Sequence, residues 1–441
     1  MTDPAGPSMG LHTDRYELTM IDAALRDGTA HRRCVFELFA RRLPGGRRYG
    51  VLAGTGRLLT LLRDFRFDDD ELRYLRDERI VSPETVRWLA SYRFRGFMRG
   101  YREGELYFPG SPVATVEGTF ADAVILETLA LSVLNHDSAV ATAAARMSTA
   151  AGERPVAEMG SRRAGEGSAV AAARAAYIAG FTATSNLEAG RRWGIPTMGT
   201  AAHSWTLLHE REEDAFRAQI DAMGRETTLL IDTYDIPRGV ETAVRVAGPQ
   251  LAGVRIDSGD LPTVAAQVRA QLDSLGATAT KITVTSDLDE YALAALAASP
   301  VDSYGVGTSV VTGSGHPTAG MVYKLVARED AAGDWVPVAK TSAEKTSAGG
   351  RKRAVRALEH GRAIAERLYR GDEATGEPAS TVERGLQVPL VEAGEIDSTA
   401  EGPEGTAAAR NHHREVRAEL PLHAFALSRS EPAIPTVTDT L

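Results

Sequence analysis

A histidine surrounded by small residues follows a short apolar run in the middle of the chain. The run 195–198 leads into Gly199 and Thr200, then two alanines, then His203. Because glycine and alanine add little bulk, a ligand could approach the imidazole ring closely. Such a ring suits a base, a metal ligand or a covalent nucleophile. A lone histidine at a strand end often only caps or hydrogen-bonds, so its neighbours decide the interpretation.

Cationic and glycine-rich segments follow other apolar runs. Arg162, Arg163 and Arg255 could each bind a carboxylate or a phosphate, because a guanidinium group binds planar oxyanions through paired hydrogen bonds. Each arginine could instead pair with an aspartate and orient a loop. Gly307 and Thr308 end a Gly-x-Gly-Thr segment whose backbone N–H groups would suit a phosphate. That segment lacks the third glycine of a dinucleotide-binding motif.

Two pairs of aspartates come after apolar runs. Asp257 and Asp260 flank a Ser-Gly pair, and they could hold magnesium indirectly, polarise a substrate ring nitrogen or orient His203. Alternatively, Asp260 caps the helix that is predicted to follow it. Asp232 and Asp235 form the second pair, and we expect them at a strand end, where either contact with a ligand or a purely structural role is open.

Apolar runs with polar ends alternate with helical patterns through the middle of the chain. The polar ends lie at 157–163, 182–186, 199–203, 229–235, 254–260, 282–287 and 304–308. Helical patterns lie between most of them, at 166–179, 212–224, 261–275 and 287–298. This alternation predicts a parallel sheet, and seven such strands favour an irregular β/α (TIM-like) barrel whose strand ends meet at one mouth. The alternative is an open doubly wound sheet, in which several polar ends only cap helices.

The flanking regions predict a second, mixed α/β domain. Its expected elements before the barrel are a helix at 15–26, a strand at 34–39 and helices near 51–64 and 69–79. After about residue 320 we expect strands at 321–326 and 335–340, a basic loop at 340–353, short strands and loops over 371–410, and a helix at 410–419. We therefore expect an α/β domain of residues 1–125 completed by 325–441, and a barrel of residues 126–324 that carries the active site.

Composition narrows the class of protein. The chain has 441 residues, 43% of them apolar and 25% charged, which suits more than one folded unit. The net charge is −9 and the basic residues are scattered, which argues against nucleic-acid binding. The single cysteine, Cys34, excludes an internal disulfide and suits a reducing compartment. The Ala-rich segments 138–151 and 168–179 are too short to span a bilayer, so we expect a cytoplasmic protein with no membrane partner.

Seven segments, in order along the chain, together resemble the motifs of one enzyme family. The segments are TDRYELTM (13–20), EMGSRRA (158–164), TSN (184–186), GTAAHS (199–204), RIDSGD (255–260), GVGT (305–308) and YKLV (323–326). In these motifs the chain resembles the nicotinate phosphoribosyltransferases, the type II phosphoribosyltransferases that make nicotinate mononucleotide in NAD salvage.

The resemblance implies an ATP-coupled, ligase-type enzyme that acts on nicotinate and 5-phosphoribosyl 1-diphosphate. It implies an irregular β/α barrel and an α/β domain built from both ends of the chain. It also implies a head-to-tail homodimer in which Asp14 and Tyr16 enter the active site of the partner subunit. Mg²⁺ would accompany the diphosphate, with no direct cluster of protein ligands for the metal.

The resemblance also implies roles for particular residues. His203 would carry a transient phosphoryl group from ATP, and Asp257 is our candidate for the group that orients its ring. The residues expected to bind nicotinate are Tyr16, Arg162, Arg163, Thr200, Arg255 and, as a neutral side chain, Ser185. Those expected to bind 5-phosphoribosyl 1-diphosphate are Arg255, Asp257, Gly307, Thr308 and Lys324.

Four other classes of protein would require residues that differ from those of this chain. A nicotinamide-specific relative would be expected to carry an acidic residue where this chain has Ser185 and Asn186, and a carboxylate there would repel nicotinate. A quinolinate enzyme would need more cations, a metal-dependent hydrolase would need a His/Asp ligand cluster, and a silent binding module would be expected to lack His203 or Arg255. One departure concerns the basic loop, where Gly349 and Gly350 stand in place of the usual Pro-Gly and predict a more flexible loop.

Overall fold

The chain forms two compact units in a computed structural model that describes residues 8–340, 349–370 and 383–439. One unit comprises Met1–Thr142 and His316–Leu441, and the other comprises Ala143–Gly315. Most of the predicted basic loop (341–348) and part of the predicted strand-and-loop region (371–382) lie outside the described residues. Each unit is described below by itself.

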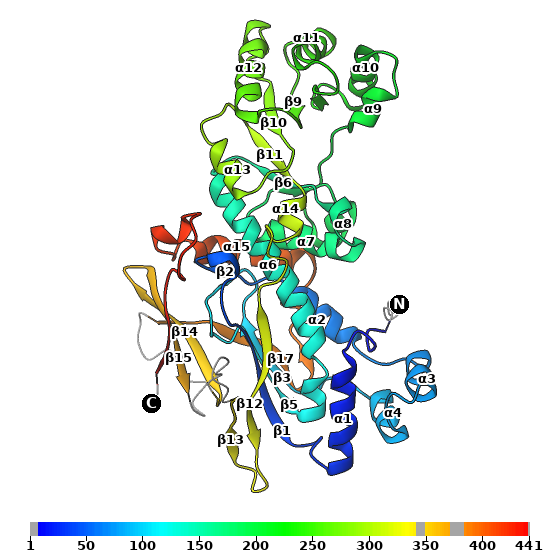
Figure 1. Cartoon of the computed structure of the whole chain (residues 1–441), viewed down its shortest axis with the longest axis vertical. Helices are drawn as coiled ribbons and strands as arrows, with labels where there is room; N and C mark the ends of the chain where they lie inside the picture. The colour runs from blue at the N-terminus through cyan, green and yellow to red at the C-terminus, as the bar shows by residue number, and fades with distance from the viewer. Residues whose placement is uncertain (1–7, 341–348, 371–382, 440–441) are drawn as a thin grey trace. The chain divides into compact units, whose positions relative to one another are not determined.

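A parallel sheet forms the centre of the unit 143–315. Its strands run in the order β7-β6-β11-β10-β9-β8, and every neighbouring pair is parallel. The strands are β6 (Val156–Glu158), β7 (Ala183–Thr184), β8 (Thr228–Leu230), β9 (Gly253–Ile256), β10 (Lys281–Val284) and β11 (Ser303–Val306). The helices of this unit, some of which are labelled in Figure 1, are α7 (Glu166–Ile178), α8 (Leu187–Trp193), α9 (His203–Leu207), α10 (Glu212–Met223), α11 (Ile236–Ala247), α12 (Leu261–Ser274), α13 (Glu290–Ala295) and α14 (Thr308–Val311).

This sheet is open between β7 and β8 in the part of the chain that the structure describes. The apolar run 195–198, predicted as a strand, makes only an isolated bridge between Thr184 and Thr197. Pro196 in this run has no N–H group to donate to a neighbouring strand, which favours a bridge over a full strand. The structure therefore confirms a mixed α/β protein with a parallel sheet, but it does not confirm the predicted barrel.

An antiparallel sheet organises the other unit and joins the two ends of the chain. Its strand order is β13-β12-β1-β5-β3-β17-β18, so three early strands lie in the centre and two late strands lie on each side of them (Figure 1). The strands are β1 (Arg33–Ala40), β3 (Phe97–Tyr101), β5 (Ala114–Thr119), β12 (Met321–Glu329), β13 (Trp335–Pro337), β17 (Gln387–Glu392) and β18 (Glu395–Ile396). Early and late segments must therefore fold together.

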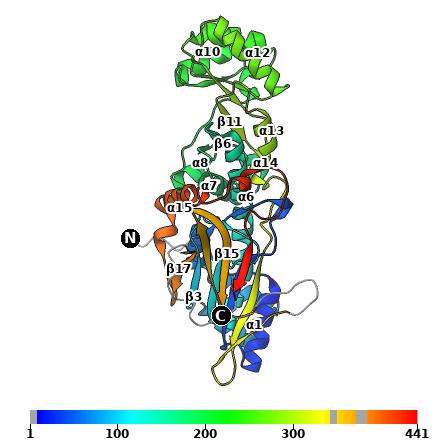
Figure 2. The same ribbon diagram turned by 90° about the vertical axis from the view of Figure 1, so that its left-hand side faces the viewer.

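A second sheet of this unit is built from late sequence alone. Its order is β16-β14-β15-β19, with the C-terminal strand β19 parallel to β15 (Figure 2). The strands are β14 (Lys352–Glu359), β15 (Arg362–Arg370), β16 (Glu383–Gly385) and β19 (Thr436–Asp439), and a small ribbon pairs β2 (Gly50–Val51) with β4 (Leu106–Tyr107). The hairpin of β14 and β15 was not among the predicted elements.

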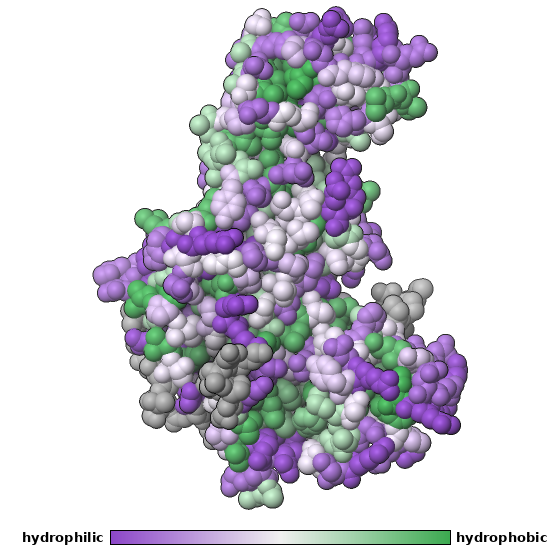
Figure 3. All heavy atoms as spheres, in the orientation of Figure 1, coloured by the Kyte–Doolittle hydropathy of each residue, from purple (hydrophilic) through white to green (hydrophobic). Residues whose placement is uncertain are grey.

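Amphipathic helices complete the core of this unit. They are α1 (Arg15–Asp27), α2 (Thr55–Asp64), α3 (Asp69–Asp77), α4 (Pro83–Ala90), α5 (Phe120–Val124) and α15 (Gly402–Arg417). α1 buries Leu18, Ile21 and Ala24 in a cluster that also contains strand residues such as Leu38. α3 buries only two leucines, and the face of α3 and α4 seen in Figure 3 is largely hydrophilic. Each helix thus presents an apolar stripe to the core, as its 3.6-residue pattern predicts.

One long apolar helix continues from the first unit into the second. α6 (Glu127–Ala151) follows α5, and by length and composition the segment 120–151 could cross a membrane. However, 67% of its apolar window is buried inside the protein, as in the core helix of a soluble protein. The predicted cytoplasmic location stays a prediction.

Most predicted elements near the sheets are confirmed, with differences at their ends. The predicted helix 15–26 is α1, the strand 34–39 is β1, and the predicted pair 321–326 and 335–340 is β12 and β13. The helix predicted to contain 410–419 is α15, which begins at Gly402, where Pro403 takes a first-turn position without losing a hydrogen bond, and ends at Arg417.

The described end of the basic loop is held in place rather than free. Gly350 N donates to Val326 O at 2.8 Å, and Lys352 Nζ forms a buried ion pair with Glu37 Oε2 at 2.6 Å. These contacts tie the start of β14 to β12 and β1. The flexibility predicted from Gly349 and Gly350 therefore does not extend into β14.

Candidate active site

Polar residues gather at the carboxyl edge of the parallel sheet. Along the strand order, the segments that follow the strands carry Ser185 after β7, Arg162 and Arg163 after β6, Gly307 and Thr308 after β11, Thr285 after β10, Asp257 after β9 and Asp232 after β8. Parallel strands bring such segments to one edge, where α/β enzymes place their ligands. The structure therefore brings the predicted polar ends to one edge, although the sheet is open.

His203 is the first residue of the short helix α9. Its Nδ1 lies 3.1 Å from Thr233 Oγ1, and its side chain is 39% exposed. Its Nε2 lies 3.9 Å from Asp232 Oδ1 and 3.7 Å from Asp257 Oδ2, distances too long for direct hydrogen bonds. The contact that orients the ring is thus made by Thr233, whereas the sequence had suggested Asp257. Nε2 remains accessible between two carboxylates.

Asp232 joins the segment after β8 to the segment after β9 near His203, although it was not among the predicted site residues. Its side chain is fully buried, and its Oδ2 accepts hydrogen bonds from Asp257 N and Ser258 Oγ, both at 2.7 Å. Its Oδ1 has no hydrogen-bond partner among the described residues. A buried carboxylate oxygen without a partner is costly unless a ligand satisfies it. The signal in the sequence was its place directly after the apolar run of β8.

Arg255 is fixed by three neighbours. Its Nε donates to Thr285 Oγ1 at 3.0 Å, and its Nη1 donates to Thr200 Oγ1 at 2.8 Å and to Ala201 O at 3.0 Å. Its Nη2 lies 3.6 Å from Asp257 Oδ2, and Thr285 Oγ1 also donates to Asp257. Arg255, Asp257 and Thr200 therefore come together as predicted. Thr285, which joins two of them, was missed because threonine is also an ordinary strand residue.

The turn that carries Arg162 and Arg163 rests on buried contacts, while both arginines are exposed. Glu158 below the turn is buried, and it accepts hydrogen bonds from Thr184 Oγ1 at 2.6 Å and from Gly160 N. Neither guanidinium group has a partner among the described residues. The turn thus presents two available cations on a rigid base.

Gly307 and Thr308 lie beside that turn. Met159 N donates to Val306 O at 2.8 Å, and a Cβ added to Gly160 would lie 2.8 Å from Gly307 O. Glycine at 160 is therefore needed for the close approach of the two segments. Thr308 is exposed, as is Ser185 on the neighbouring strand end. This second group of residues could hold an oxyanion next to the arginines.

Two of the aspartates that the sequence singled out serve as helix caps. Asp260 Oδ1 accepts from Thr263 N at the start of α12, and Asp235 Oδ1 accepts from Arg238 N at the start of α11, both at 3.0 Å. The hydrogen bonds that Asp260 accepts from Thr263 lower the pKa of the Asp260 carboxyl. The alternative given for Asp260 is therefore the one that the structure supports.

Tyr16 and Lys324 belong to the unit that contains both chain ends, and their contacts within that unit are as follows. Tyr16 lies in the first turn of α1 and is 46% exposed. Burial of its hydroxyl and the nearby carboxylate of Glu127, to which it hydrogen-bonds, raise the pKa of Tyr16. Lys324 lies on β12 opposite Glu37 of β1. Their predicted contacts with substrate stay predictions.

Within residues 8–340, 349–370 and 383–439, no cluster of three or more His, Cys, Asp or Glu side chains could hold a metal ion. Two carboxylate oxygens, Asp232 Oδ1 and Asp257 Oδ2, nevertheless face the same ring nitrogen of His203. Such a pair suits a hard cation only if other oxygen ligands arrive with a substrate.

Comparisons with known proteins agree on one family. A model described as the nicotinate phosphoribosyltransferase N-terminal domain matches residues 11–135, and one described as the nicotinate phosphoribosyltransferase family matches residues 155–370. The second match contains the whole carboxyl edge described above.

Similar proteins extend over most of the chain. Nicotinate phosphoribosyltransferase pncB1 of Mycobacterium tuberculosis is 56% identical, covering 99% of this chain and 96% of that protein. Nicotinate phosphoribosyltransferase of Bacillus subtilis is 38% identical, covering 80% and 74%. The crystal structure of human nicotinic acid phosphoribosyltransferase superimposes with a TM-score of 0.81 at 27% identity, covering 96% and 97%. On these matches and on the site that they contain, the chain belongs to the nicotinate phosphoribosyltransferase family.

Proposed function

We propose that this protein joins nicotinate to the ribose phosphate of 5-phosphoribosyl 1-diphosphate, giving nicotinate mononucleotide and diphosphate. The observation that carries the proposal is the fixed guanidinium group of Arg255, held by Thr200 and Thr285 beside Asp257. In a chain of this family, that cation offers a receptor for the carboxylate of the base.

Charge at the site supports nicotinate over nicotinamide. Arg162, Arg163 and Arg255 provide cations, and Ser185 adds no negative charge at its strand end. The carboxylate of nicotinate gains binding energy from these cations, whereas the neutral amide of nicotinamide gains little. Tyr16 would stack on the pyridine ring from the partner subunit of a homodimer, which is part of the proposal.

In the transfer step, the ring nitrogen of nicotinate forms a bond to C1 of the ribose as the bond from C1 to the diphosphate oxygen breaks. Positive charge develops on the sugar carbon, and negative charge leaves with the diphosphate. The protein's contribution is to position the reactants and to stabilise these charges. Gly307, Thr308 and Lys324 would hold phosphate oxygens, and Asp257 and Arg255 would also contact 5-phosphoribosyl 1-diphosphate.

The proposal includes coupling to ATP hydrolysis, in which His203 acts as the nucleophile. Its Nε2 would bond to the γ-phosphorus of ATP as ADP leaves, and water would later cleave the N–P bond. Thr233 at Nδ1 would fix the ring for this attack. Asp232 Oδ1 and Asp257 Oδ2 would hold Mg²⁺ that arrives with the phosphates, and the cation supplies charge neutralisation.

The test is a parallel assay of nicotinate, nicotinamide and quinolinate, each with 5-phosphoribosyl 1-diphosphate and with or without ATP. We expect nicotinate to exceed nicotinamide by at least ~100-fold in kcat/KM, which corresponds to about two 1.4 kcal/mol steps. Equal use of the two bases would refute the substrate assignment. Acid-labile labelling by γ-labelled ATP, present in the wild type and absent in His203→Ala, tests the phosphohistidine separately.

A further inference from the structure

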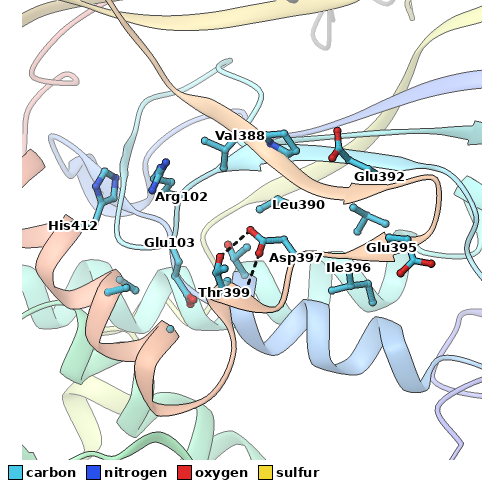
Figure 4. Close-up of a pocket in the computed structure, with 17 residues that line it drawn as sticks. Arg102, Glu103, Val388, Leu390, Glu392, Glu395, Ile396, Asp397, Thr399 and His412 are labelled. Atoms are coloured by element: carbon cyan, nitrogen blue, oxygen red, sulfur yellow. Dashed lines mark hydrogen bonds between the residues drawn. The ribbon is translucent and has the colours of Figure 1, made fainter.

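A pocket of about 610 Å³ lies within the unit that contains both chain ends, and no predicted site residue is part of its lining (Figure 4). Its walls come from β17, β18, the turn that follows them, α15, the start of α2 and residues 102–103. This volume lies in the range of small-molecule sites. The proposed transfer reaction uses none of these residues.

Small side chains on α15 keep the pocket open. Gly405, Ala408 and Ala409 line it from one side of the helix, and Leu390 and Ile396 supply apolar surface from the strands. A Cβ at Gly405 would lie 2.2 Å from the backbone carbon of Ala400, so the helix can pack here only with glycine. Leu390 and Ile396 thus give the pocket an apolar wall that suits a hydrocarbon or aromatic body, with Asp397 and Thr399 beside it (Figure 4).

Three polar groups of the lining are occupied by the protein itself. Glu103 accepts hydrogen bonds from the backbone N–H groups of Gly54 and Gly56 at the start of α2. Asp397 accepts from both the N–H and the hydroxyl of Thr399 at 2.9 Å. His412 Nε2 lies 3.0 Å from Glu105 Oε2. Glu103, Asp397 and His412 thus already have hydrogen-bond partners in the protein, so we do not assign ligand recognition to them.

Three charged groups of the lining have no such partner in the described part of the chain. They are Arg102, Glu392 and Glu395, all of them exposed. In Figure 4, Arg102 lies on one side of the pocket, the two glutamates lie on the other, and Leu390 lies between them. The available charges are thus separated, with the cation and the carboxylates at opposite ends of an apolar surface.

We propose that this pocket binds a small zwitterion: an anionic group at Arg102, an apolar or aromatic body over Leu390 and Ile396, and a cationic group at Glu392 and Glu395. A purely anionic ligand would leave the two glutamates unpaired and would be repelled by them. A purely cationic ligand would face the same repulsion from Arg102. Only a molecule with both charges satisfies both ends.

A set of three matched probes tests the charges one at a time. The zwitterion is 3-(pyridinium-1-yl)propane-1-sulfonate, N-propylpyridinium lacks the anion, and 3-phenylpropane-1-sulfonate lacks the cation. Binding is measured by calorimetry on the full chain, and the position is checked by soaking crystals. We expect the zwitterion to bind at least ~10-fold more tightly than either single-charge probe, a difference of about 1.4 kcal/mol.

Substitutions in the lining test whether the zwitterion binds in this pocket. Arg102→Gln should reduce zwitterion affinity to that of the cationic probe, and Glu392→Gln with Glu395→Gln should reduce it to that of the anionic probe. Glu404→Gln, an exposed change on α15 outside the lining, is the matched control and should change nothing. Because all these side chains are exposed, the Tm of each variant should match the wild type.

Equal affinity of the three probes would overturn the proposal. So would zwitterion binding that Arg102→Gln or the double glutamate change leaves intact, since the molecule would then bind elsewhere. These outcomes do not depend on the proposed transfer reaction, because no step uses nicotinate or 5-phosphoribosyl 1-diphosphate.

Discussion

Thr233 Oγ1 lies 3.1 Å from Nδ1 of His203, on the side of the ring away from the two carboxylates near Nε2. If Nδ1 carries the proton and donates it to Thr233, Nε2 has a free lone pair. A neutral ring in this tautomer is the form that a phosphoryl acceptor requires. In that tautomer, the contact with Thr233 leaves Nε2 as the ring nitrogen that can react.

The first prediction concerns this contact. Thr233→Val keeps the shape of the side chain but removes the hydroxyl, and we expect it to lower the rate of His203 phosphorylation by about 10- to 100-fold. Thr233→Ser keeps the hydroxyl and serves as the control, with a loss of less than about fivefold. Rapid-quench labelling with γ-labelled ATP measures both. Equal labelling rates in the valine and serine variants would contradict the orienting role.

The second prediction concerns the link between Arg255 and Asp257. Thr285 accepts from the first and donates to the second, so Thr285→Val leaves one Arg255 N–H and one Asp257 oxygen without this partner. We expect KM for nicotinate to rise by about 10-fold or more, because an unmade hydrogen bond to a charged group costs about 1.5–3 kcal/mol. Thr285→Ser should stay close to the wild type. Unchanged KM values in both variants would mean that Thr285 does not position Arg255.

The sequence predicted the carboxyl edge of the parallel sheet well. Asp257, Arg255, Thr200 and His203 lie there because buried apolar strands must end in polar segments at one edge. Their partners were harder to predict. For Asp232 the sequence left ligand contact and a structural role equally open, and a hydrogen bond such as that of Thr285 depends on register between strands.

Closure of the sheet and the late hairpin could not be predicted from local pattern. The run 195–198 has strand-like composition, but its proline and its surroundings leave it with one bridge. The hairpin of β14 and β15 is rich in arginine. Charged residues such as Arg356 and Glu366 occupy buried positions there, so the sequence lacks the alternation of apolar and polar residues that predicts a strand. Burial there depends on charge pairs, such as those of Arg356 with Glu366 across the hairpin and with Glu105 of an earlier segment, and an apolar pattern does not show them.

The third prediction concerns the proposed homodimer. If Tyr16 of each subunit completes the site of its partner, Tyr16→Ala and His203→Ala chains should each lack ATP-coupled activity alone. When they are mixed and reassociated, half of the dimers are mixed and each has one intact site. About a quarter of wild-type activity should therefore return. No recovery, with mixed dimers confirmed by native mass spectrometry, would show that each site comes from one chain.

The fourth prediction concerns the buried pair of Lys352 and Glu37, whose nitrogen and oxygen are 2.6 Å apart. Lys352→Met leaves the Glu37 carboxyl buried without its cation, and we expect a loss of about 3–5 kcal/mol in the free energy of unfolding. Adding Glu37→Gln to Lys352→Met should restore part of the lost free energy of unfolding. Lys281→Met removes a surface ion pair and is the control, with a loss below about 1 kcal/mol. Equal losses from the two lysine variants would contradict the burial argument.

The last prediction concerns pH and His413, a buried histidine at the base of α15. Its Nδ1 donates to Gly104 O at 3.0 Å, and burial lowers its pKa from 6.5 to about 4. Between these values the unfolded chain binds a proton that the folded chain does not, so stability is complete above pH 6.5 and falls as the pH approaches 4. The loss amounts to at most about 3 kcal/mol.

His413→Asn keeps a donor for Gly104 but cannot titrate, so its free energy of unfolding should fall less steeply over this interval than that of the wild type. Urea unfolding at pH 8, 6, 5 and 4.5 gives the two curves. His360→Asn is the matched control, because His360 is exposed and its left-handed backbone, with φ 49°, accepts asparagine. The control should follow the wild-type curve. Parallel curves for the wild type and His413→Asn would show that His413 binds its proton equally in the folded and unfolded states.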